Sequence, residues 1–506
     1  MRKFVPLLLL ISFALQAQGT RDRAWLELND ATTLWASSFN AAGLAASPYK
    51  EFNTLSASYG AEGGDWRRMQ TGTGVSGLKF DTQGARRIGQ IQVWGRFNYS
   101  NSDDRGSSFN TLLYNPYDER FLYNVADTVA GQWKRQCYDM QFKLAAPLGD
   151  KFAAGLHVKY TDKIAAGQID PRAESYNYCV DVRPGLVWMA AGSTIGLSGV
   201  YSNTFERSTP SISNSQQIQK VFIMRGLGNW VGDQVGGSGL STMYYRCNSW
   251  GAALEYAWEG SWKLFSELSW INHGTRISES ATQPKLHGNT RQDEFKLNVT
   301  ALFGGRETLH RLCLDGSMVQ TKGIEPTVLW NTAEGIWEVQ NELMQCSFNT
   351  LEAFVAYDGY RLSGESYSWH WAGALGFEGK NDSYATPSSV FSYGNICARA
   401  AADTRIPAGK GSVSLGLGLE GVKNLSAGYS YSGHRSGTAP VRDLYPHNLA
   451  VLSASRAGAS LKAEWAFPMA DGLSLAVSAE GSGVLAFSSI GLLRRLGALG
   501  AVILYF

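Results

Sequence analysis

The chain is poor in charge, and its body contains no long apolar run. Only 17% of its 506 residues are charged, against about a quarter in an average soluble domain. Its 45 basic and 43 acidic residues nearly cancel, so it lacks the clustered basic surplus that nucleic-acid binding requires. We therefore predict no nucleic-acid partner. Because no run of 18 or more apolar residues occurs outside the N-terminus, a bundle of membrane-spanning helices is also excluded.

Cysteine is scarce as well, and no two cysteines lie close together in the sequence. The pattern contains no CxxC motif, so it predicts neither a zinc site nor a dense disulfide framework. We expect no metal and no cofactor. One or two disulfides and a role as small wall residues both stay open for the six cysteines, which are Cys137, Cys179, Cys247, Cys313, Cys346 and Cys397.

Glycine and aromatic residues, in contrast, are abundant. The 56 glycines make up about 11% of the chain, where about 7% is usual, and aromatics make up 12%. An apolar fraction of 44% excludes disorder. This composition favours an all-β protein, although the mean hydropathy of -0.18 resembles that of a soluble one.

The N-terminus predicts export. Met1-Arg2-Lys3 is a short basic stretch, the apolar core runs over residues 4–14, and Ala17 is a small residue suited to cleavage. We therefore expect a signal peptide at 1–17, a periplasmic or lumen-inserting segment at 18–50, and one further domain at 51–506. Arg2 and Lys3 account for the whole basic surplus, so the mature chain is formally neutral.

The body of the chain alternates apolar and polar residues with period two, which is the signature of β-strands. Aromatic residues lie near the ends of several apolar stripes, as in the girdles of a transmembrane barrel. The segments with the clearest alternation are 90–99, 138–144, 152–161, 176–188, 262–270, 294–301, 368–377 and 461–467.

The predicted connections alternate in length, which is the outer-membrane pattern. Short ones include 147–150, 259–260, 304–306, 406–410 and 468–472, and long ones include 101–131, 203–239, 273–291 and 434–446. About eight short turns predict a transmembrane antiparallel β-barrel of about 18 strands in the outer membrane, with 14 or 16 as alternatives. The outer-membrane lipid is then an obligatory partner.

The last residues resemble the assembly signal of such barrels. Val502, Leu504 and Phe506 share one apolar face, and the chain ends on an aromatic residue. This implies recognition by the barrel assembly machinery.

Charged residues fall on the phase opposite the apolar stripes. On the lipid face each Lys or Arg at mid-depth would cost about 2–4 kcal/mol, so we expect these residues to face the lumen. Both signs are mixed, which does not indicate a strongly selective pore; a lumen filled by ion pairs and a solute-binding lumen both stay open. Pro184 is expected on the lipid face, with a bulge. The lumen-facing candidates are Arg96, Asp139, His157, Lys159, Asp181, Arg183, Lys263, Glu267, Lys296 and His370.

No catalytic residue is predicted. The only His-x-Ser triplet, residues 434–436, lies in a predicted loop, whereas nucleophilic catalysis needs a base held rigidly against the nucleophile. We therefore expect a protein that is not an enzyme. Aromatic stretches at 121–123 and 221–224 predict that some long loops fold inward or contact a partner.

Two resemblances add to this prediction. Residues 40–45, Asn-Ala-Ala-Gly-Leu-Ala, follow an expected short helix at 24–35 and resemble the Asn-Pro-Ala-Gly-Leu-Ala motif of fatty-acid-transporter-like barrels, except at Ala41. The resemblance implies that Asn40, Gly43 and Leu44 form a hatch in the lumen and that the solute is hydrophobic.

Residues 93–101, with the overall layout, look like an uncharacterised family of outer-membrane barrels from Gram-negative anaerobes. That resemblance implies an accessory channel or binding component of a nutrient or metal uptake system, with a TonB-dependent receptor or a surface lipoprotein as partner. A structural or assembly partner of other surface proteins is a further alternative.

Overall fold

The structure, a computed structural model, describes residues 21–214, 220–235, 241–470 and 472–506. The predicted signal peptide at 1–17 lies outside the described residues. Among the residues described, no helix is long and apolar enough to cross a membrane.

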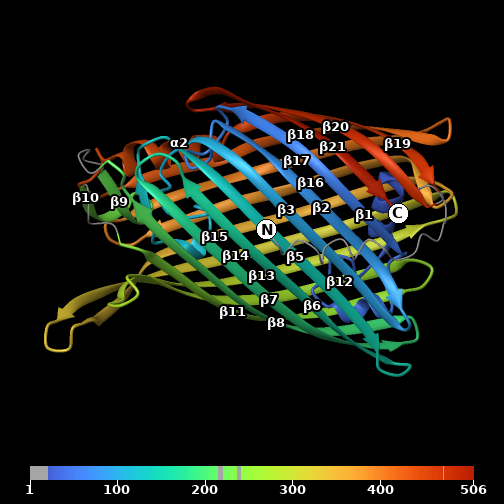
Figure 1. Cartoon of the computed structure of the whole chain (residues 1–506), viewed down its shortest axis with the longest axis horizontal. Coiled ribbons are helices and arrows are strands. Elements are labelled where there is room, and N and C mark those ends of the chain that lie inside the picture. Colours follow the sequence, from blue (N-terminus) through green and yellow to red (C-terminus); the bar gives the residue numbers. More distant parts are fainter. Residues whose placement is uncertain (1–20, 215–219, 236–240, 471) are drawn as a thin grey trace, which may run out of the picture.

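Eighteen antiparallel strands form one closed barrel (Figure 1). Each barrel strand pairs with the barrel strands that precede and follow it in the sequence. The barrel closes because β1 pairs with the last strand, β21, as well as with β2. The predicted number of 18 strands is therefore confirmed, and the alternatives of 14 and 16 are wrong. The strands are β1 (Phe52–Gly64), β2 (Gly74–Ile88), β3 (Ile91–Ser107), β5 (Gly131–Pro147), β6 (Phe152–Gly167), β7 (Arg172–Ala190), β8 (Ser193–Ser211), β11 (Met243–Glu259), β12 (Lys263–Glu279), β13 (Lys285–Gly304), β14 (Thr308–Asn331), β15 (Ile336–Ser363), β16 (Ser366–Tyr384), β17 (Ser389–Ala408), β18 (Gly411–Tyr431), β19 (Ser455–Ala470), β20 (Leu473–Ser488) and β21 (Gly491–Tyr505).

The two faces of the barrel wall differ as the period-two pattern predicts. On β7, Leu186 is 56% exposed on the outside, whereas Ser175, on the opposite phase, is completely buried inside. Leu254, Leu268 and Leu461 are likewise more than half exposed. An apolar outer surface is stable only against hydrocarbon, and a closed barrel leaves no unpaired strand edge in it. The protein is an outer-membrane β-barrel.

The strand connections differ between the two ends, but less than predicted. Eight connections of two to four residues lie at the end that holds the C-terminus, which is the periplasmic end of such barrels. At the other end, the connections at 108–130, 212–242 and 432–454 are long. The long loop predicted at 273–291 is wrong, because β12 continues to Glu279 and β13 begins at Lys285.

Pro184 lies on the outer face of β7, as predicted, but the predicted bulge is wrong. The β7–β8 register is the same on both sides of the proline, with Val182 opposite Tyr201 and Gly185 opposite Ser198. Between these pairs, Arg183 and Pro184 have no partner on β8. The ladder therefore has a local gap, because proline lacks the N–H that would complete it.

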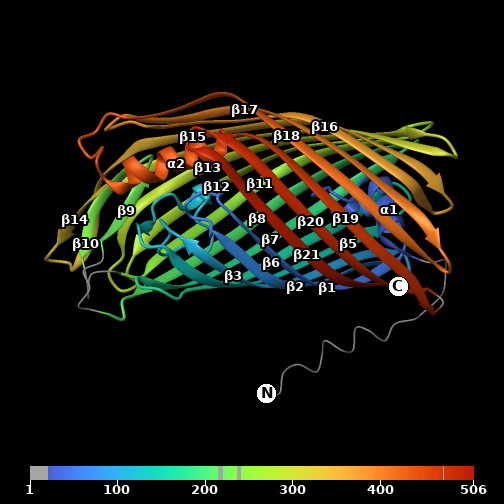
Figure 2. The same ribbon diagram turned by 90° about the horizontal axis from the view of Figure 1, so that it is seen from above.

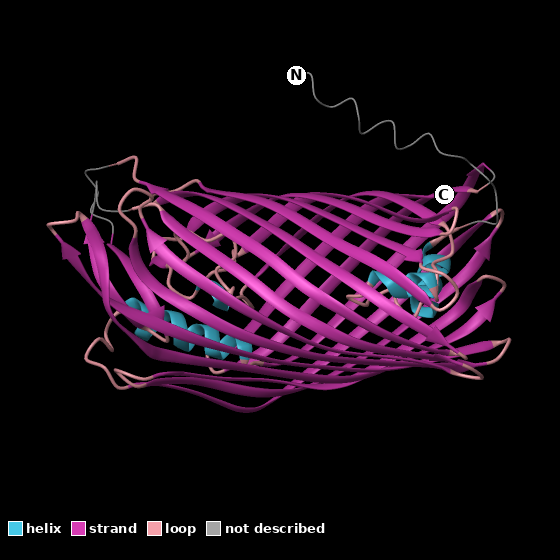
Figure 3. Cartoon of the chain, turned by 90° about the horizontal axis from the view of Figure 1, so that it is seen from below, coloured by secondary structure: helices cyan, strands magenta, loops and turns pink. Residues whose placement is uncertain are grey.

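Short elements occupy the inside of the barrel at both ends (Figures 2 and 3). Near the periplasmic end lie α1 (Arg23–Thr32) and the 3₁₀ turn η2 (Ala41–Ala45). The helix expected at 24–35 thus exists and is slightly shorter. Toward the other end lie the 3₁₀ turn η3 (Glu119–Phe121), the π-helical turn η4 (Pro440–Leu444), α2 (Tyr445–Leu452), and a small sheet of β4 (Val125–Asp127), β9 (Lys220–Gly226) and β10 (Asn229–Val235).

The hairpin of β14 and β15 projects beyond the extracellular rim (Figure 1). These strands have 24 and 28 residues, and Trp330 and Trp337 pair near the tip with ring centroids 5.3 Å apart.

All six cysteines are free thiols. Cys137 and Cys179 are partly buried, and the other four are buried.

Candidate functional site

Residues 21–51, which we call the N-terminal plug, cross the periplasmic mouth of the barrel and contact its inner wall. The plug starts at Asp22, a fully buried carboxylate that caps α1 by accepting a hydrogen bond from the Trp25 amide at 3.0 Å. The same carboxylate accepts hydrogen bonds from Arg405 on β17 and from the Ser412 hydroxyl on β18, at 3.0 Å. One residue thus both begins the helix and ties it to two strands.

On the opposite wall, Asn40 is the main anchor of the plug. Its side chain accepts a hydrogen bond from the Ala42 amide at 3.0 Å, which starts η2. The amide group of the same side chain donates to the Leu186 carbonyl on β7 at 3.0 Å and to Glu255 on β11 at 3.2 Å. Because Asn40 is fully buried, these bonds satisfy polar groups that would otherwise be costly.

Glycines on adjacent strands make room for this anchor. A Cβ atom on Gly155 would lie 2.1 Å from the Ala42 nitrogen, and one on Gly185 would lie 2.0 Å from the Asn40 Oδ1 atom. Within the plug, a Cβ on Gly43 would lie 1.8 Å from the Trp35 ring. Leu44 is also buried and belongs to the same apolar cluster. The wall and the plug are therefore complementary in shape at η2.

Charged wall residues bind the link between α1 and η2. The Lys143 ammonium donates to the Ala36 carbonyl at 2.6 Å and to the Ser38 carbonyl at 3.2 Å. Glu267 accepts hydrogen bonds from the Ser38 hydroxyl at 2.7 Å and from the Phe39 amide at 2.9 Å. Glu267 was predicted to face the lumen, but the sequence predicted neither Glu267 nor Lys143 as an anchor of the plug, since most of their partners are backbone groups that no motif records.

A polar chain connects α1 to four neighbouring strands. Arg23 pairs with Asp403 on β17 at 3.0 Å. The next link is His370 on β16, whose two ring nitrogens lie 3.3 Å from carboxylate oxygens of Asp403 and of Asp358 on β15. Asp358 in turn pairs with Arg311 on β14 at 3.4 Å. His370, predicted to face the lumen, therefore connects the plug to the wall.

The other predicted lumen residues form ion pairs or lie close to the plug. Arg96 pairs with Asp81 at 2.7 Å, Lys159 with Asp139 at 3.1 Å, Arg183 with Asp181 at 2.6 Å, and Lys296 with Glu294. Lys263 instead pairs with Glu259 beside a periplasmic turn, at 2.8 Å.

Arg183 and His157 differ from the other predicted lumen residues in their surroundings. Arg183 also stacks on the plug's Phe39, 3.9 Å from the ring centroid. His157 is 9% exposed, and neither ring nitrogen has a hydrogen-bond partner among the described residues.

Among the carboxylates of the N-terminal plug, Asp30 has the pKa that is shifted most. It lies on the exposed side of α1, near Glu27, Tyr49, Arg96 and Lys143. Loss of solvation near the surrounding protein, and then the charge of Glu27, raise the pKa of Asp30 to about 6, although Arg96 and Lys143 oppose this rise.

We expect docking of the plug to depend on pH through Asp30. A pKa of about 6 lies above the ordinary 3.8, so docking is favoured while Asp30 is protonated and weakens as the pH rises from about 4 through 6. Hydrogen exchange of α1, corrected for intrinsic rates, should be slower at pH 5 than at pH 7.5. Asp30→Asn should remove this difference, and Asp150→Asn, in a periplasmic turn, should retain it. An unchanged difference in Asp30→Asn would contradict the prediction.

At the extracellular end, residues 108–130 fold inward and form part of a second obstruction. Together with residues 220–235 and 432–454 we call them the loop plug. Leu112, Leu113, Phe121 and Tyr123 are nearly fully buried in one apolar cluster that includes wall residues. The stretches 121–123 and 221–224 were predicted either to fold inward or to contact a partner. They fold inward, because Phe121, Tyr123, Val221, Phe222 and Met224 are buried.

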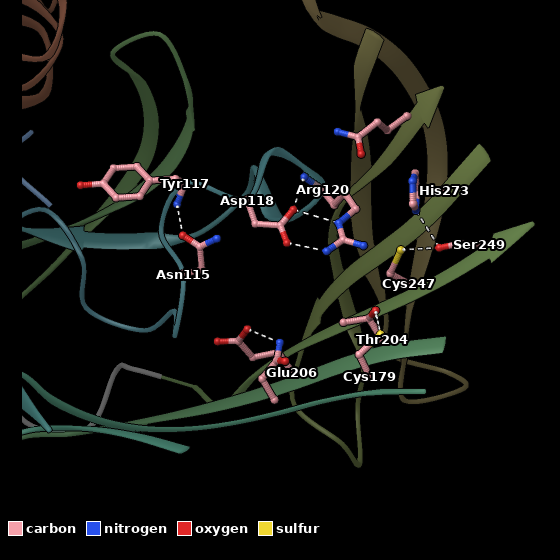
Figure 4. Close-up of polar contacts among 12 residues, drawn as sticks. Asn115, Tyr117, Asp118, Arg120, Cys179, Thr204, Glu206, Cys247, Ser249 and His273 are labelled. Atoms are coloured by element: carbon pink, nitrogen blue, oxygen red, sulfur yellow. Dashed lines mark hydrogen bonds and ion pairs between the residues drawn. The ribbon is translucent and has the colours of Figure 1, made fainter. Parts of the chain in front are cut away.

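A buried carboxylate anchors the loop plug, as at the other end. Glu206 on β8 accepts hydrogen bonds from the Tyr114 amide at 2.7 Å, from the Ser175 hydroxyl at 2.5 Å and from Asn177 at 2.8 Å. Figure 4 shows Glu206 on the wall below the loop that carries Asp118 and Arg120. No sequence pattern distinguished Glu206, because its function depends on a loop about 90 residues away.

A Ser-His-Glu constellation lies on the adjacent strands β11, β12 and β13, and Figure 4 shows its Ser249 and His273 near Arg120. The Ser249 hydroxyl is 2.7 Å from Nδ1 of His273, and Nε2 of His273 is 3.4 Å from Glu294. This order of groups is that of a nucleophile, a base and an orienting acid. However, Ser249 is completely buried, so a substrate could not reach it in this state.

We expect Ser249 to be unreactive. A fluorophosphonate probe should label Ser249 in less than about 5% of the folded molecules, because a hydroxyl that the probe cannot reach cannot attack the probe. Mass spectrometry of the labelled chain provides the measurement, and Ser249→Ala should give the same background. Stoichiometric labelling that disappears in Ser249→Ala would instead identify an enzyme.

The predicted C-terminal assembly residues close the barrel. Val502 lies opposite Ala57, and Leu504 lies opposite Leu55. The Phe506 amide donates to the Asn53 carbonyl at 3.0 Å.

No group of three or more metal-ligating side chains is present in the described part of the chain.

Comparison with known proteins assigns a family. Residues 41–491 match a family described as "Family of unknown function (DUF6850)". The chain belongs to this family. No curated protein sequence matches the chain.

Several solved outer-membrane proteins are similar at low identity. They include the ferric preacinetobactin receptor BauA from Acinetobacter baumannii (8% identity, TM-score 0.42, covering 90% of this chain and 80% of that one). The transporter YddB from Escherichia coli gives 8% identity and a TM-score of 0.40, with coverages of 90% and 81%. A monoaromatic hydrocarbon channel, TodX, gives 10% identity and a TM-score of 0.32, with coverages of 92% and 92%. Likenesses this low say nothing about function.

Proposed function

We propose that this DUF6850 protein is a gated component of an outer-membrane uptake system, which holds or passes a small hydrophilic solute. The observation that carries the proposal is that its own chain occupies the lumen at both ends. A barrel of 16–18 strands is wide enough for an aqueous channel. Because the wall can enclose such a channel without being filled, the folded segments inside it are suited to controlling the passage of solutes.

The lining favours a hydrophilic solute. Between the two plugs, ion pairs such as Lys159–Asp139 and Arg399–Glu420 keep partly exposed side chains. Because these charges are of both signs, they offer water and polar solutes hydrogen-bonding partners without excluding either ion type.

The N-terminal plug is the element suited to gating the periplasmic end of the lumen. It is held by apolar packing together with hydrogen bonds and ion pairs to single residues, and the polar contacts can be exchanged for water one by one when the plug moves into the periplasm. In planar bilayers the full-length barrel is expected to show no current steps at low voltage. Large current steps from the full-length barrel would contradict the proposal that its lumen is closed at rest.

The proposal includes a partner in uptake, a TonB-dependent receptor or a surface lipoprotein. The projecting β14–β15 hairpin, with Trp330 and Trp337 at its tip, offers a surface for such a partner. Affinity-tagged barrel extracted from native outer membranes in mild detergent should copurify with the receptor or lipoprotein. Purification of the barrel alone would favour an independent channel.

A second candidate is the passage of a hydrophobic solute through the wall, which the gap in the β7–β8 ladder at Pro184 favours. This gap is next to Gly185, which contacts the plug. Pro184→Val, which can restore the missing bond, should then abolish uptake of a hydrophobic solute and leave uptake of a hydrophilic one unchanged. Equal uptake of the hydrophobic solute by both chains would exclude this route.

A further inference from the structure

A cavity of about 150 Å³ lies between the loop plug and the barrel wall. It is distinct from the N-terminal plug, since its walls come from the β1–β2 connection, the loop plug, and strands β15 to β17. Much of the wall is apolar. The apolar residues that line it include Phe109, Phe121, Phe348, Phe391, Leu444 and Leu452.

Arg68 supplies to this cavity a cation that has no ion-pair partner among the described residues. Its guanidinium carbon lies 3.3 Å from the centroid of the Tyr117 ring, and no carboxylate of the described residues lies within 4 Å of it. Burial lowers the pKa of Arg68, although Tyr117 and the charge of Glu119 oppose this shift. Its neighbour Arg67 differs, because it donates to the Thr71 carbonyl at 2.7 Å and does not line the cavity.

Asp382 supplies an unsatisfied anion to the same cavity. The residue is 2% exposed, and its Oδ1 atom has no hydrogen-bond partner among the described residues. Its Oδ2 atom lies 3.3 Å from the Lys380 ammonium, and Lys380 also pairs with Glu119. Two carboxylates therefore share the Lys380 ammonium, and Oδ1 of Asp382 is left without a donor from the described part of the chain. A buried acceptor without a donor is costly, and a ligand can supply the donor.

We propose that the cavity binds a small zwitterion, namely an α-amino acid with an aliphatic side chain. The ligand carboxylate binds Arg68, its ammonium binds the Asp382 carboxylate, and its side chain packs on the phenylalanines. A cavity of about this volume accommodates benzene, so an aliphatic side chain fits. As a capture site for uptake the cavity rests on the proposed function, but binding is measurable without transport.

Calorimetry on the purified full-length barrel tests the proposal with three ligands of nearly equal shape. These are L-leucine, isopentylamine, which lacks the carboxylate, and 4-methylpentanoate, which lacks the ammonium. Leucine is expected to bind, and each analogue to bind at least about 10-fold more weakly, because each leaves one buried charge unpaired. Absence of leucine binding, or equal affinity for all three, would overturn the proposal.

Variants assign the two ends of the ligand. Arg68→Gln should weaken leucine binding about 10- to 100-fold and leave the affinity for isopentylamine unchanged. Asp382→Asn should weaken leucine binding and leave 4-methylpentanoate unchanged. The control, Arg67→Gln, should stay within about 2-fold of wild type. Equal leucine affinity in Arg68→Gln and Arg67→Gln would place leucine elsewhere and refute this site. A silent barrel that binds leucine as described would support the site even if the uptake proposal failed.

Discussion

Removal of both plugs is expected to convert a silent barrel into one with large, stable current steps. The N-terminal plug (residues 21–51) occupies the periplasmic mouth, and apolar residues of the loop plug (residues 108–130, 220–235 and 432–454) are buried against the wall at the other end. Either obstruction alone interrupts the path, so each single deletion should give small or no steps, and the double deletion should give steps typical of an open 18-stranded barrel. Planar-bilayer recordings of the four chains measure this directly.

The matched control removes a part of the chain outside the lumen. Shortening the projecting β14–β15 hairpin by residues 328–339 deletes a surface element but no plug, and it should leave the barrel without current steps. Large steps from either single deletion would show that one plug alone closes the path. A silent double deletion that is folded by circular dichroism would show that the wall side chains close the lumen, contrary to the proposal.

A single methyl group on the wall is expected to displace the N-terminal plug. The Cβ atom of Gly155→Ala would lie 2.1 Å from the Ala42 nitrogen, a backbone atom that cannot rotate away. Overpacking of this kind costs about 1–3 kcal/mol, which corresponds to about 5- to 150-fold more frequent opening of the plug. Hydrogen–deuterium exchange of residues 23–45 should accelerate by that factor.

Gly185→Ala should act in the same way, because its Cβ atom would meet the Asn40 side chain at 2.0 Å. Gly481→Ala on β20 is the control, since nothing lies within 4 Å of its Cβ position, and exchange in the plug should stay at the wild-type rate. If exchange in both test variants equals that of the control, η2 is not docked on this part of the wall in solution.

The barrel could be predicted from the sequence because its physics is local. A strand that faces lipid on one side and the lumen on the other must alternate, and this alternation is visible in β7 without knowledge of any neighbour. The same rule placed charges such as Asp181 and Arg183 on the inner phase. Short turns between such strands gave their number.

The predicted hatch residues also have a local signal. Asn40 caps η2 through its own side chain, which is a short-range pattern. In contrast, Glu206 and Glu255 were missed and the anchoring role of Lys143 was not predicted, because each contact joins residues about 90 or more positions apart. A buried anchor and an ordinary lumen charge have the same sequence signature.

The sequence by itself determined a neutral, closed all-β wall with an apolar outside and a charged inside, because each strand must satisfy the lipid and the lumen separately. Only the tertiary structure decided what fills the lumen. The positions of Arg68 and Asp382 around one cavity, and of Gly155 and Gly185 under Asn40, depend on how loops and plug fold back across the barrel. Such contacts between distant segments follow from packing in three dimensions, and no period or motif in the chain encodes them.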